Sequence, residues 1–286
     1  MTPVTMGSVL RFSQVDVFTS EFLLGNPVAV VHDADALSDE QMAGFARWTN
    51  LSETTFLSAP TDPRADYRLR IFTTAHELPF AGHPTLGSAR AWLTAGGVPR
   101  SEDEVVQQCG VGLVRIRRAG EQLAFAAPPL RRSGPVDPSD VAQLARGLGV
   151  PAAQVVDAQW ADNGPGWVAL LLPDADTVVN LEPDARSFGP FVDIGVIGPC
   201  PSGSDTAFEV RAFIVDGGSL VEDPVTGSLN AALAQWLIPA GLAPTASVAS
   251  QGTRRHRRGR VHVVAEDGEI WVGGDTVVGV EGTVRL

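Results

Sequence analysis

Two short stretches of the chain place acidic or imidazole side chains beside a glycine where a helix is expected to begin. Residues 77–87 are ELPFAGHPTLG, and residues 222–230 are EDPVTGSLN. Each follows a strand-like run and opens an alanine-rich segment. The backbone N–H groups and the dipole of a helix attract anions to its N-terminus. We therefore expect the two stretches to hold one anionic ligand between them.

The residues at these two helix starts suggest how the ligand would be held. Backbone N–H groups near Gly82 and His83, and near Gly227 and Ser228, would bind a carboxylate. His83 is expected to be neutral because the helix dipole disfavours its charge, and it could polarise the substrate or relay a proton. Asp223 could orient His83 or bind a substrate amine. Helix capping is the simpler alternative for both side chains.

Glu53 is the candidate for proton transfer. It lies in residues 50–57, NLSETTFL, at the entrance to a predicted strand over residues 54–57. Burial in a cleft would raise the pKa of a carboxyl group toward neutrality, as a general acid/base requires. One such group could take a proton from carbon and return it elsewhere on the same molecule. From the residue alone, a surface carboxylate at a strand start is the simpler interpretation.

Hydrophobic patterning predicts a strand-rich chain with few helices. Strands are predicted at residues 12–18, 28–31, 54–57, 67–72, 105–108, 112–117, 122–126, 154–159, 167–172, 209–213, 261–264, 269–272 and 276–280, and helices at 37–48, 84–95, 139–148 and 228–237. Ser38 and Gln41 form an expected capping box at the start of the first helix. Residues 131–138 are expected to be a linker.

The second half of the chain is predicted to repeat the first. Residues 68–72 and 209–213 share an Arg-x-Phe ending, and Trp-Leu pairs occur at equivalent places in the two alanine-rich helices. We expect an α+β protein with two pseudo-symmetric domains, residues 1–127 and 128–275. A C-terminal strand at about 276–286 is expected to return to the first domain. Each domain would be a curved, mostly antiparallel sheet or barrel around a central helix, with the ligand in the cleft between them.

The repeat also bears on the number of bases. Aligning Ser38 with Ser139 places Gln154 opposite Glu53. Glutamine cannot accept a proton as a base, so this approximate alignment favours a single acid/base group in the first domain.

Composition excludes several classes of protein. The net charge of −12 argues against a nucleic-acid partner. All 21 basic residues are arginine, which excludes a pyridoxal phosphate Schiff base and a P-loop. Cys109 and Cys200 are isolated, and the histidines lack metal-like spacing, so we expect neither a disulfide nor a metal site. The basic segment 254–260 is either a solvated loop or an anion-binding or subunit-contact loop.

No segment is expected to cross or anchor in a membrane. No apolar run approaches the length that a membrane helix needs, and residues 1–16 lack the charged start and apolar core of a signal peptide. A cytoplasmic location is the resulting expectation.

Several motifs in order along the chain resemble the PhzF isomerase family of phenazine biosynthesis, which shares the fold of diaminopimelate epimerase. They are DVFT at 16–19, GNPVAV at 25–30, LSDEQM at 37–42, NLSET at 50–54, ELPFAGHPT at 77–85, EDPVTGS at 222–228, QG at 251–252 and VGG at 272–274. Together they span nearly the whole chain. Any one of them would be a weak signal, whereas the ordered set is specific.

The resemblance implies a cofactor-independent isomerase that forms a homodimer and shifts a proton within a small carboxylate-bearing substrate. It assigns the catalytic glutamate to Glu53, maps His83 and Asp223 onto further catalytic positions, and implies that Gly227 and Ser228 help to hold the substrate. Two alternatives stay open. One is a non-catalytic binding protein on the same fold, and the other is a cofactor-independent racemase or epimerase, which would need His83 or Asp223 as a second base.

Overall fold

The computed structural model describes residues 8–216 and 218–286 and divides into two compact units. The first unit contains the chain up to Leu23, then Pro27–Phe125 and Asp275–Leu286, and the second contains Leu24–Asn26 and Ala126–Gly274. The sequence placed the domain boundaries at 127/128 and 275/276, and it gave no sign that residues 24–26 join the second unit. Residues 1–7, part of the segment judged above for a signal peptide, lie outside the described residues.

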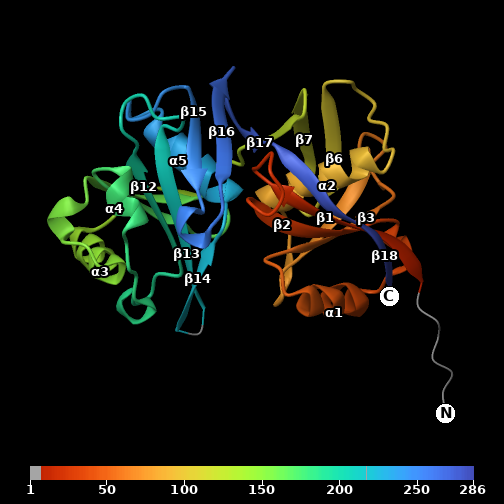
Figure 1. The fold of residues 1–286 in the computed structure, drawn as a ribbon, viewed down its shortest axis with the longest axis horizontal. Coiled ribbons are helices and arrows are strands. Elements are labelled where there is room, and N and C mark those ends of the chain that lie inside the picture. The colour runs from red at the N-terminus through yellow and green to blue at the C-terminus, as the bar shows by residue number, and fades with distance from the viewer. Residues whose placement is uncertain (1–7, 217) are drawn as a thin grey trace, which may run out of the picture. The chain divides into compact units, whose positions relative to one another are not determined.

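The first unit is a mixed, mostly antiparallel sheet with a helix inside it (Figure 1). Its strands are β1 (Val9–Val17), β2 (Asn26–Val31), β3 (Thr54–Ser58), β4 (Tyr67–Phe72), β5 (Glu77–Leu78), β6 (Glu104–Cys109), β7 (Gly112–Ala119), β8 (Gln122–Ala126) and β18 (Thr276–Arg285), and its α-helices are α1 (Asp39–Thr49) and α2 (Gly82–Thr94). β1 pairs with β18 and β2, and β2 runs parallel to β3. β4 is antiparallel to β3 and β5 and parallel to β6, which continues into the antiparallel β7 and β8.

The second unit has the same succession of pairings. Its strands are β9 (Arg132–Pro135), β10 (Asp157–Asp162), β11 (Val168–Leu171), β12 (Asp193–Pro199), β13 (Phe208–Asp216), β14 (Ser219–Asp223), β15 (Ala246–Gln251), β16 (Gly259–Glu266) and β17 (Glu269–Gly274), and its α-helices are α3 (Pro138–Leu148), α4 (Ala175–Val179) and α5 (Gly227–Leu237). β11 is parallel to β12, β13 is antiparallel to β12 and β14, and β13 is parallel to β15. The α+β class and the internal repeat are therefore confirmed.

The strand register corrects the sequence alignment of the two halves. Thr54 lies opposite Phe72 in the first unit, and Ile194 lies opposite Phe213 in the second. The counterpart of Glu53 is therefore Asp193, and the prediction of Gln154 was wrong. The cause is that α1 connects β2 to β3 whereas α3 connects β9 to β10, so the two aligned helices are not equivalent.

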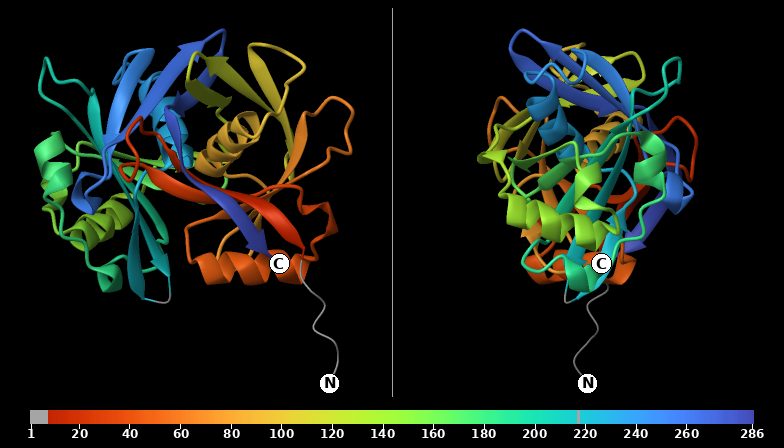
Figure 2. Two further views of the ribbon diagram at one scale, coloured as in Figure 1. Left: turned by 45° about the vertical axis from the view of Figure 1, so that its right-hand side comes forward. Right: turned by 90° about the vertical axis from the view of Figure 1, so that its left-hand side faces the viewer.

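α2 is the central helix of the first unit. It contacts β1, β3 and β18 and lies among the strands of this unit (Figure 2). Its residues from Gly82 to Ala89 are all buried. A Cβ atom on Gly87 would lie 2.3 Å from Cγ1 of Val28, so the glycine permits close contact between helix and sheet. In the second unit α5 contacts β10, β16 and β17, and Gly195 leaves room in the same way for the side chain of Leu229.

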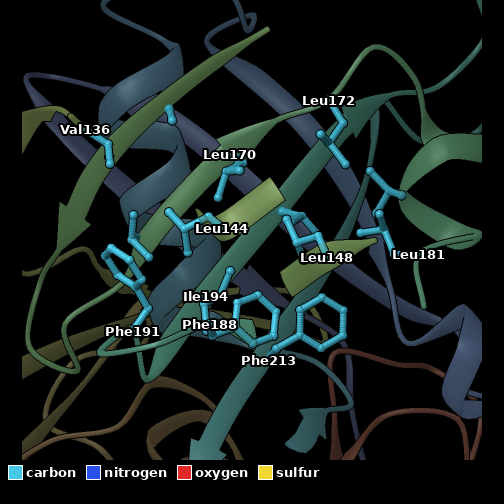
Figure 3. Close-up of a cluster of buried hydrophobic side chains, with 14 residues drawn as sticks. Val136, Leu144, Leu148, Leu170, Leu172, Leu181, Phe188, Phe191, Ile194 and Phe213 are labelled. Carbon is cyan, nitrogen blue, oxygen red and sulfur yellow. The ribbon is translucent and has the colours of Figure 1, made fainter. Parts of the chain in front are cut away.

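Two hydrophobic clusters lie under the outer helices. Met42 and Phe45 of α1 pack with Phe56 and Phe72 of the first sheet. α3 covers the cluster of the second unit, in which Leu144 and Leu148 meet strand residues such as Leu170 and Ile194 (Figure 3). The central helices are therefore held by close packing of small residues, and the outer helices by large apolar side chains.

Local sequence signals predicted some helix boundaries and missed others. Ser38 and Gln41 form the expected capping box of α1. α3 begins at Pro138 with Asp137 as its N-cap, so the expected start at Ser139 was wrong. The supposed linker contains β9, and β12, β14, β15 and α4 were missed.

Two helical glycines should respond to alanine in opposite ways. We expect Gly87→Ala to destabilise the protein by about 1–3 kcal/mol, because the methyl group would collide with Val28 and the equally stiff Val17. Gly44 lies in α1, where a Cβ would meet nothing closer than Arg47 Nη2 at 3.8 Å. Gly44→Ala should stabilise by up to about 1 kcal/mol. Equilibrium urea unfolding of both variants would measure this, and equal effects would contradict the close packing of α2.

Candidate active site

Glu53 and His83 meet at the start of the central helix of the first unit. Oε2 of Glu53 lies 3.4 Å from Nε2 of His83, and the two side chains are only 15% and 6% exposed. Burial lowers the pKa of His83 to about 3, so the imidazole is neutral and the contact is not an ion pair near pH 7. A neutral imidazole nitrogen can either donate its proton to a carboxylate or accept one from a carboxylic acid. The first unit therefore places a neutral imidazole beside a largely buried carboxyl group.

Hydrogen bonds between β3 and its neighbours hold Glu53 in place. The hydroxyl of Thr55 donates to the carbonyl of Ala29 on β2 and also lies 2.9 Å from the hydroxyl of Ser88 on α2. Both hydroxyls are fully buried. Because Glu53 is two residues before Thr55, this link fixes the end of the strand relative to the helix that carries His83.

The first turn of α2 supplies backbone donors beside this pair. Ala81 is the N-cap, and its side chain caps no helix N–H. The first backbone hydrogen bond of the helix runs from Thr85 to the carbonyl of Ala81. The N–H groups of Gly82 and His83 precede that bond, at the position in a helix where anions commonly bind.

Asp223, Gly227 and Ser228 lie together at the start of α5 in the second unit. Asp223 ends β14 and accepts hydrogen bonds at both carboxylate oxygens, from Asn26 Nδ2 at 2.9 Å and from Thr226 Oγ1 at 2.6 Å. Burial raises the pKa of Asp223 to about 6, although both hydrogen bonds oppose this shift. The carboxylate holds the loop that leads into α5 and does not cap the helix itself.

Ser228 is fixed from outside the helix by residues that the sequence did not single out. Trp167 Nε1 donates to its hydroxyl oxygen at 3.1 Å, and Asn163 Nδ2 donates to its carbonyl at 2.8 Å. Because the hydroxyl accepts from Trp167, its own hydrogen remains available for a ligand. Thr226, the N-cap of α5, does not cap the helix with its side chain, so the N–H groups of Gly227 and Ser228 resemble those at the start of α2.

The same arginine–glutamate pair precedes both helix starts. Arg70 donates twice to Glu77, at 2.7 and 2.6 Å, and Arg211 donates twice to Glu222, at 2.9 and 2.9 Å. Each arginine also lies over the phenylalanine two residues further on. These bidentate pairs tie the short strand before each helix start to the long strand beside it. The Arg-x-Phe endings and the leading glutamates were visible in the sequence, but their contact was not.

Asp193, the counterpart of Glu53, was missed because the two halves were aligned incorrectly. Burial and the neighbouring carboxylate of Asp162 raise the pKa of Asp193 to about 6. A Cβ on Gly166 would lie 3.7 Å from its Oδ2, in ordinary van der Waals contact. The second unit therefore carries two carboxyl groups, those of Asp193 and Asp223, whose pKa is raised to about 6.

The remaining candidates stay outside these sites. Cys109 and Cys200 are free thiols, and burial raises the pKa of Cys109. Among residues 8–216 and 218–286, no three His, Cys, Asp or Glu side chains are grouped to hold a metal ion. Within that part of the chain, every helix is also too short or too polar to cross a bilayer. The basic segment runs from the short 3-10 helix Thr253–Arg255 into β16, and Arg254, Arg255 and Arg258 are exposed.

Comparisons with known proteins match almost the entire chain. A family model described as PhzC-PhzF, phenazine biosynthesis-like protein, matches residues 15–283. The Schizosaccharomyces pombe protein named antisense-enhancing sequence 1 is 37% identical over 266 residues, covering 86% of this chain and 87% of that protein. A trans-2,3-dihydro-3-hydroxyanthranilate isomerase of Pseudomonas aeruginosa is 36% identical over 226 residues, covering 78% of each. A solved structure from the same organism, described as a predicted epimerase, is 29% identical with a TM-score of 0.78, covering 96% of this chain and 99% of that one.

His83 should remain neutral across the physiological range. With its pKa lowered to about 3 by burial, its ring resonances should not shift between about pH 5 and pH 8, because protonation lies below that window. Nitrogen-15 NMR of histidine-labelled protein would measure this, with His83→Gln used to assign the signal. A titration of the His83 ring within that window would contradict the presence of a neutral imidazole beside Glu53.

Asp193→Asn should stabilise the protein at neutral pH. The folded pKa of about 6 exceeds the unaffected value of 3.8, so the carboxyl contributes stability below about pH 4 and loses it as the pH rises through 6. The variant should therefore gain about 1–2 kcal/mol at pH 7.5, allowing for partial solvent exposure, and nothing at pH 4. Urea unfolding at both pH values tests this, with the exposed Asp205→Asn as control. A gain that does not depend on pH would refute the stated cause.

Proposed function

The chain belongs to the phenazine biosynthesis-like (PhzC-PhzF) family of isomerases, with a diaminopimelate epimerase-like fold, and from this premise we propose that it moves a proton within a small carboxylate-bearing substrate. Glu53 is the general acid/base of this reaction. No cofactor takes part, as the resemblance to the family implies. The absence of lysine also excludes a pyridoxal phosphate Schiff base.

The contact between Glu53 and His83 is the observation that carries this proposal. A carboxylate in a buried site is a stronger base than one in water, because burial disfavours its charge. His83 Nε2 lies 3.4 Å from Oε2 of Glu53 and is neutral, so it does not fix Glu53 as the carboxylate in the way that a cationic partner would.

The reaction balances with one carboxyl group. Glu53 removes a proton from a substrate carbon, and the electron pair of the broken C–H bond forms a new double bond to the neighbouring carbon. At the same time, the electron pair of the existing double bond of that neighbour shifts to its far carbon. The far carbon of that double bond then takes the same proton back from Glu53. The product is an isomer in which a hydrogen and a double bond have exchanged places, and no electrons are gained or lost.

Helix N-termini support the choice of a carboxylate substrate. The first turns of α2 and α5 each offer backbone N–H groups without intrahelical partners, and Ser228 adds a hydroxyl hydrogen. A relative that is 36% identical is named for trans-2,3-dihydro-3-hydroxyanthranilate, which is an amino-carboxylate. We propose substrates of the same class for this protein, with Asp223 as the group that would face an amine or hydroxyl.

Epimerisation is a second candidate, because the second unit supplies its own titratable carboxylate. Asp193 occupies the position of Glu53 in the repeat, and its pKa is raised to about 6 by burial. A two-base epimerase needs a second acid/base group besides Glu53, and a pKa of about 6 suits Asp193 to that role. Full activity of Asp193→Asn would exclude this mechanism.

Glu53→Gln should abolish turnover and leave substrate binding intact. Gln cannot accept the proton, so we expect a fall in kcat of about 10²- to 10⁴-fold. The assay would use trans-2,3-dihydro-3-hydroxyanthranilate and a panel of small cyclic amino-carboxylates, with product isomers and solvent deuterium uptake followed by NMR.

Glu40→Gln is the matched control because Glu40 is exposed in the first turn of α1 of the same unit. It should retain the activity of the unaltered protein. Substantial activity in Glu53→Gln would refute the assignment of the base. Binding of a panel member by the unaltered protein without isomerisation or exchange would instead indicate a non-catalytic binding protein.

A further inference from the structure

Two motifs that the proposed chemistry leaves without a role meet in the second unit. They are GNP at residues 25–27 and QG at residues 251–252. Residues 24–26 belong to the second unit although the chain on both sides of them belongs to the first. Both motifs contact the loop from Asp223 to Thr226 that leads into α5.

Asn26 contacts this loop through the nitrogen of its side-chain amide. Nδ2 donates to Oδ1 of Asp223 at 2.9 Å and to the carbonyl of Val225 at 2.9 Å. The side chain is completely buried, so water does not compete for these bonds. The two hydrogens of one amide therefore join the carboxylate to the backbone of its own loop.

Gln251 fixes the other half of the same loop. Its Oε1 accepts from the N–H of Thr226 at 2.9 Å and from Asn230 Nδ2 at 3.0 Å. Its Nε2 donates to the hydroxyl of Thr226 at 2.8 Å. Because an amide nitrogen can only donate, the Thr226 hydroxyl must accept there, and its single hydrogen points to Oδ2 of Asp223 at 2.6 Å. The directions of both hydrogen bonds to Asp223 are thus determined.

The chain backbone encloses this network closely. Gly252 has a positive φ of 96°, and a Cβ there would lie 2.7 Å from the carbonyl of Pro224. A Cβ on Gly259 would lie 2.7 Å from the carbonyl of Gln251 and 2.5 Å from Val225 Cγ2. The loop has no room to shift, so the amide hydrogens remain directed at the carboxylate.

We infer that Asn26 is a positioning residue for Asp223, holding its carboxylate in one orientation and in its ionised form, with Gln251 and Thr226 completing the arrangement. Each carboxylate oxygen accepts one hydrogen bond from the protein and keeps a lone pair for a ligand donor. The inference rests on the proposed function in one respect, which is the contact that Asp223 makes with a substrate. The contacts that define it involve protein groups alone.

The electrostatic surroundings make this role measurable. Burial raises the pKa of Asp223, the hydrogen bonds from Thr226 and Asn26 lower it, and the charge of Glu222 raises it. Glu222 is the charged neighbour of Asp223, and it accepts two hydrogen bonds from Arg211 of β13. Loss of the Asn26 donor should therefore raise the pKa of Asp223 above its present value of about 6, because the ionised form would lose a partner.

The experiment is a carbon-13 NMR titration of aspartate carboxyl groups in the full-length protein, with Asp223→Asn used to assign the signal. We expect Asn26→Ala to raise the pKa of Asp223 by about one unit. Asn26→Leu keeps a side chain of similar size and removes the donor, so it should raise that pKa as well. Asn180→Ala, which removes an exposed amide that bonds only the carbonyl of Asp176, is the control and should leave it unchanged.

The outcomes separate this inference from the proposed function. An unchanged pKa of Asp223 in both Asn26 variants would overturn the positioning role, even if both were less stable. If Asn26→Ala fails to fold, Asn26→Leu decides alone, and a pKa no higher than that of the unaltered protein overturns the inference. Full activity of Glu53→Gln together with the expected pKa shifts would refute the proposed function and leave the positioning role of Asn26 standing.

Discussion

The exclusion of water from the first turn of α2 is the constraint on which the proposed chemistry depends. It lowers the pKa of His83 to about 3, which keeps the imidazole neutral, and it buries the contact with Glu53. That burial requires a helix of small residues inside the sheet, with Gly87 against Val28 and with hydroxyls of Thr55 and Ser88 linking strand to helix. A larger or more hydrated helix start would leave the imidazole of His83 with an ordinary pKa.

The two units share a framework and differ in the groups it carries. Both have a bidentate arginine–glutamate pair before the central helix. In both, a glycine packs closely on the proline two residues after that glutamate, Gly110 on Pro79 and Gly252 on Pro224. His83 in one unit corresponds to Ser228 in the other. The duplication thus repeated the elements that fix a helix start, while the side chains placed there became different. Similar scaffolds with different groups are expected when function depends on local chemistry.

Local signals predicted the elements, and the missing information was about contacts between distant residues. The capping box of α1, the alternating strands and the two helix starts were recognisable because each depends on neighbouring residues. Asp193 could not be identified as the counterpart of Glu53, because strand register is set by pairing over long separations. The contact of Asn26 with Asp223 joins residues 197 positions apart, and no local pattern announces it. Glu53 and His83 were named from motifs, but their approach to 3.4 Å required the fold.

The central claim is that Glu53 carries the proton from one carbon to the other. The most direct measurement uses a substrate that the protein converts, labelled with deuterium at the carbon that loses its hydrogen. The position of the label is determined after a single turnover in ordinary water. If Glu53 is shielded from solvent and returns the same proton, part of the label should appear at the accepting carbon. Complete loss of the label to solvent, with rapid turnover retained in Glu53→Gln, would contradict the account.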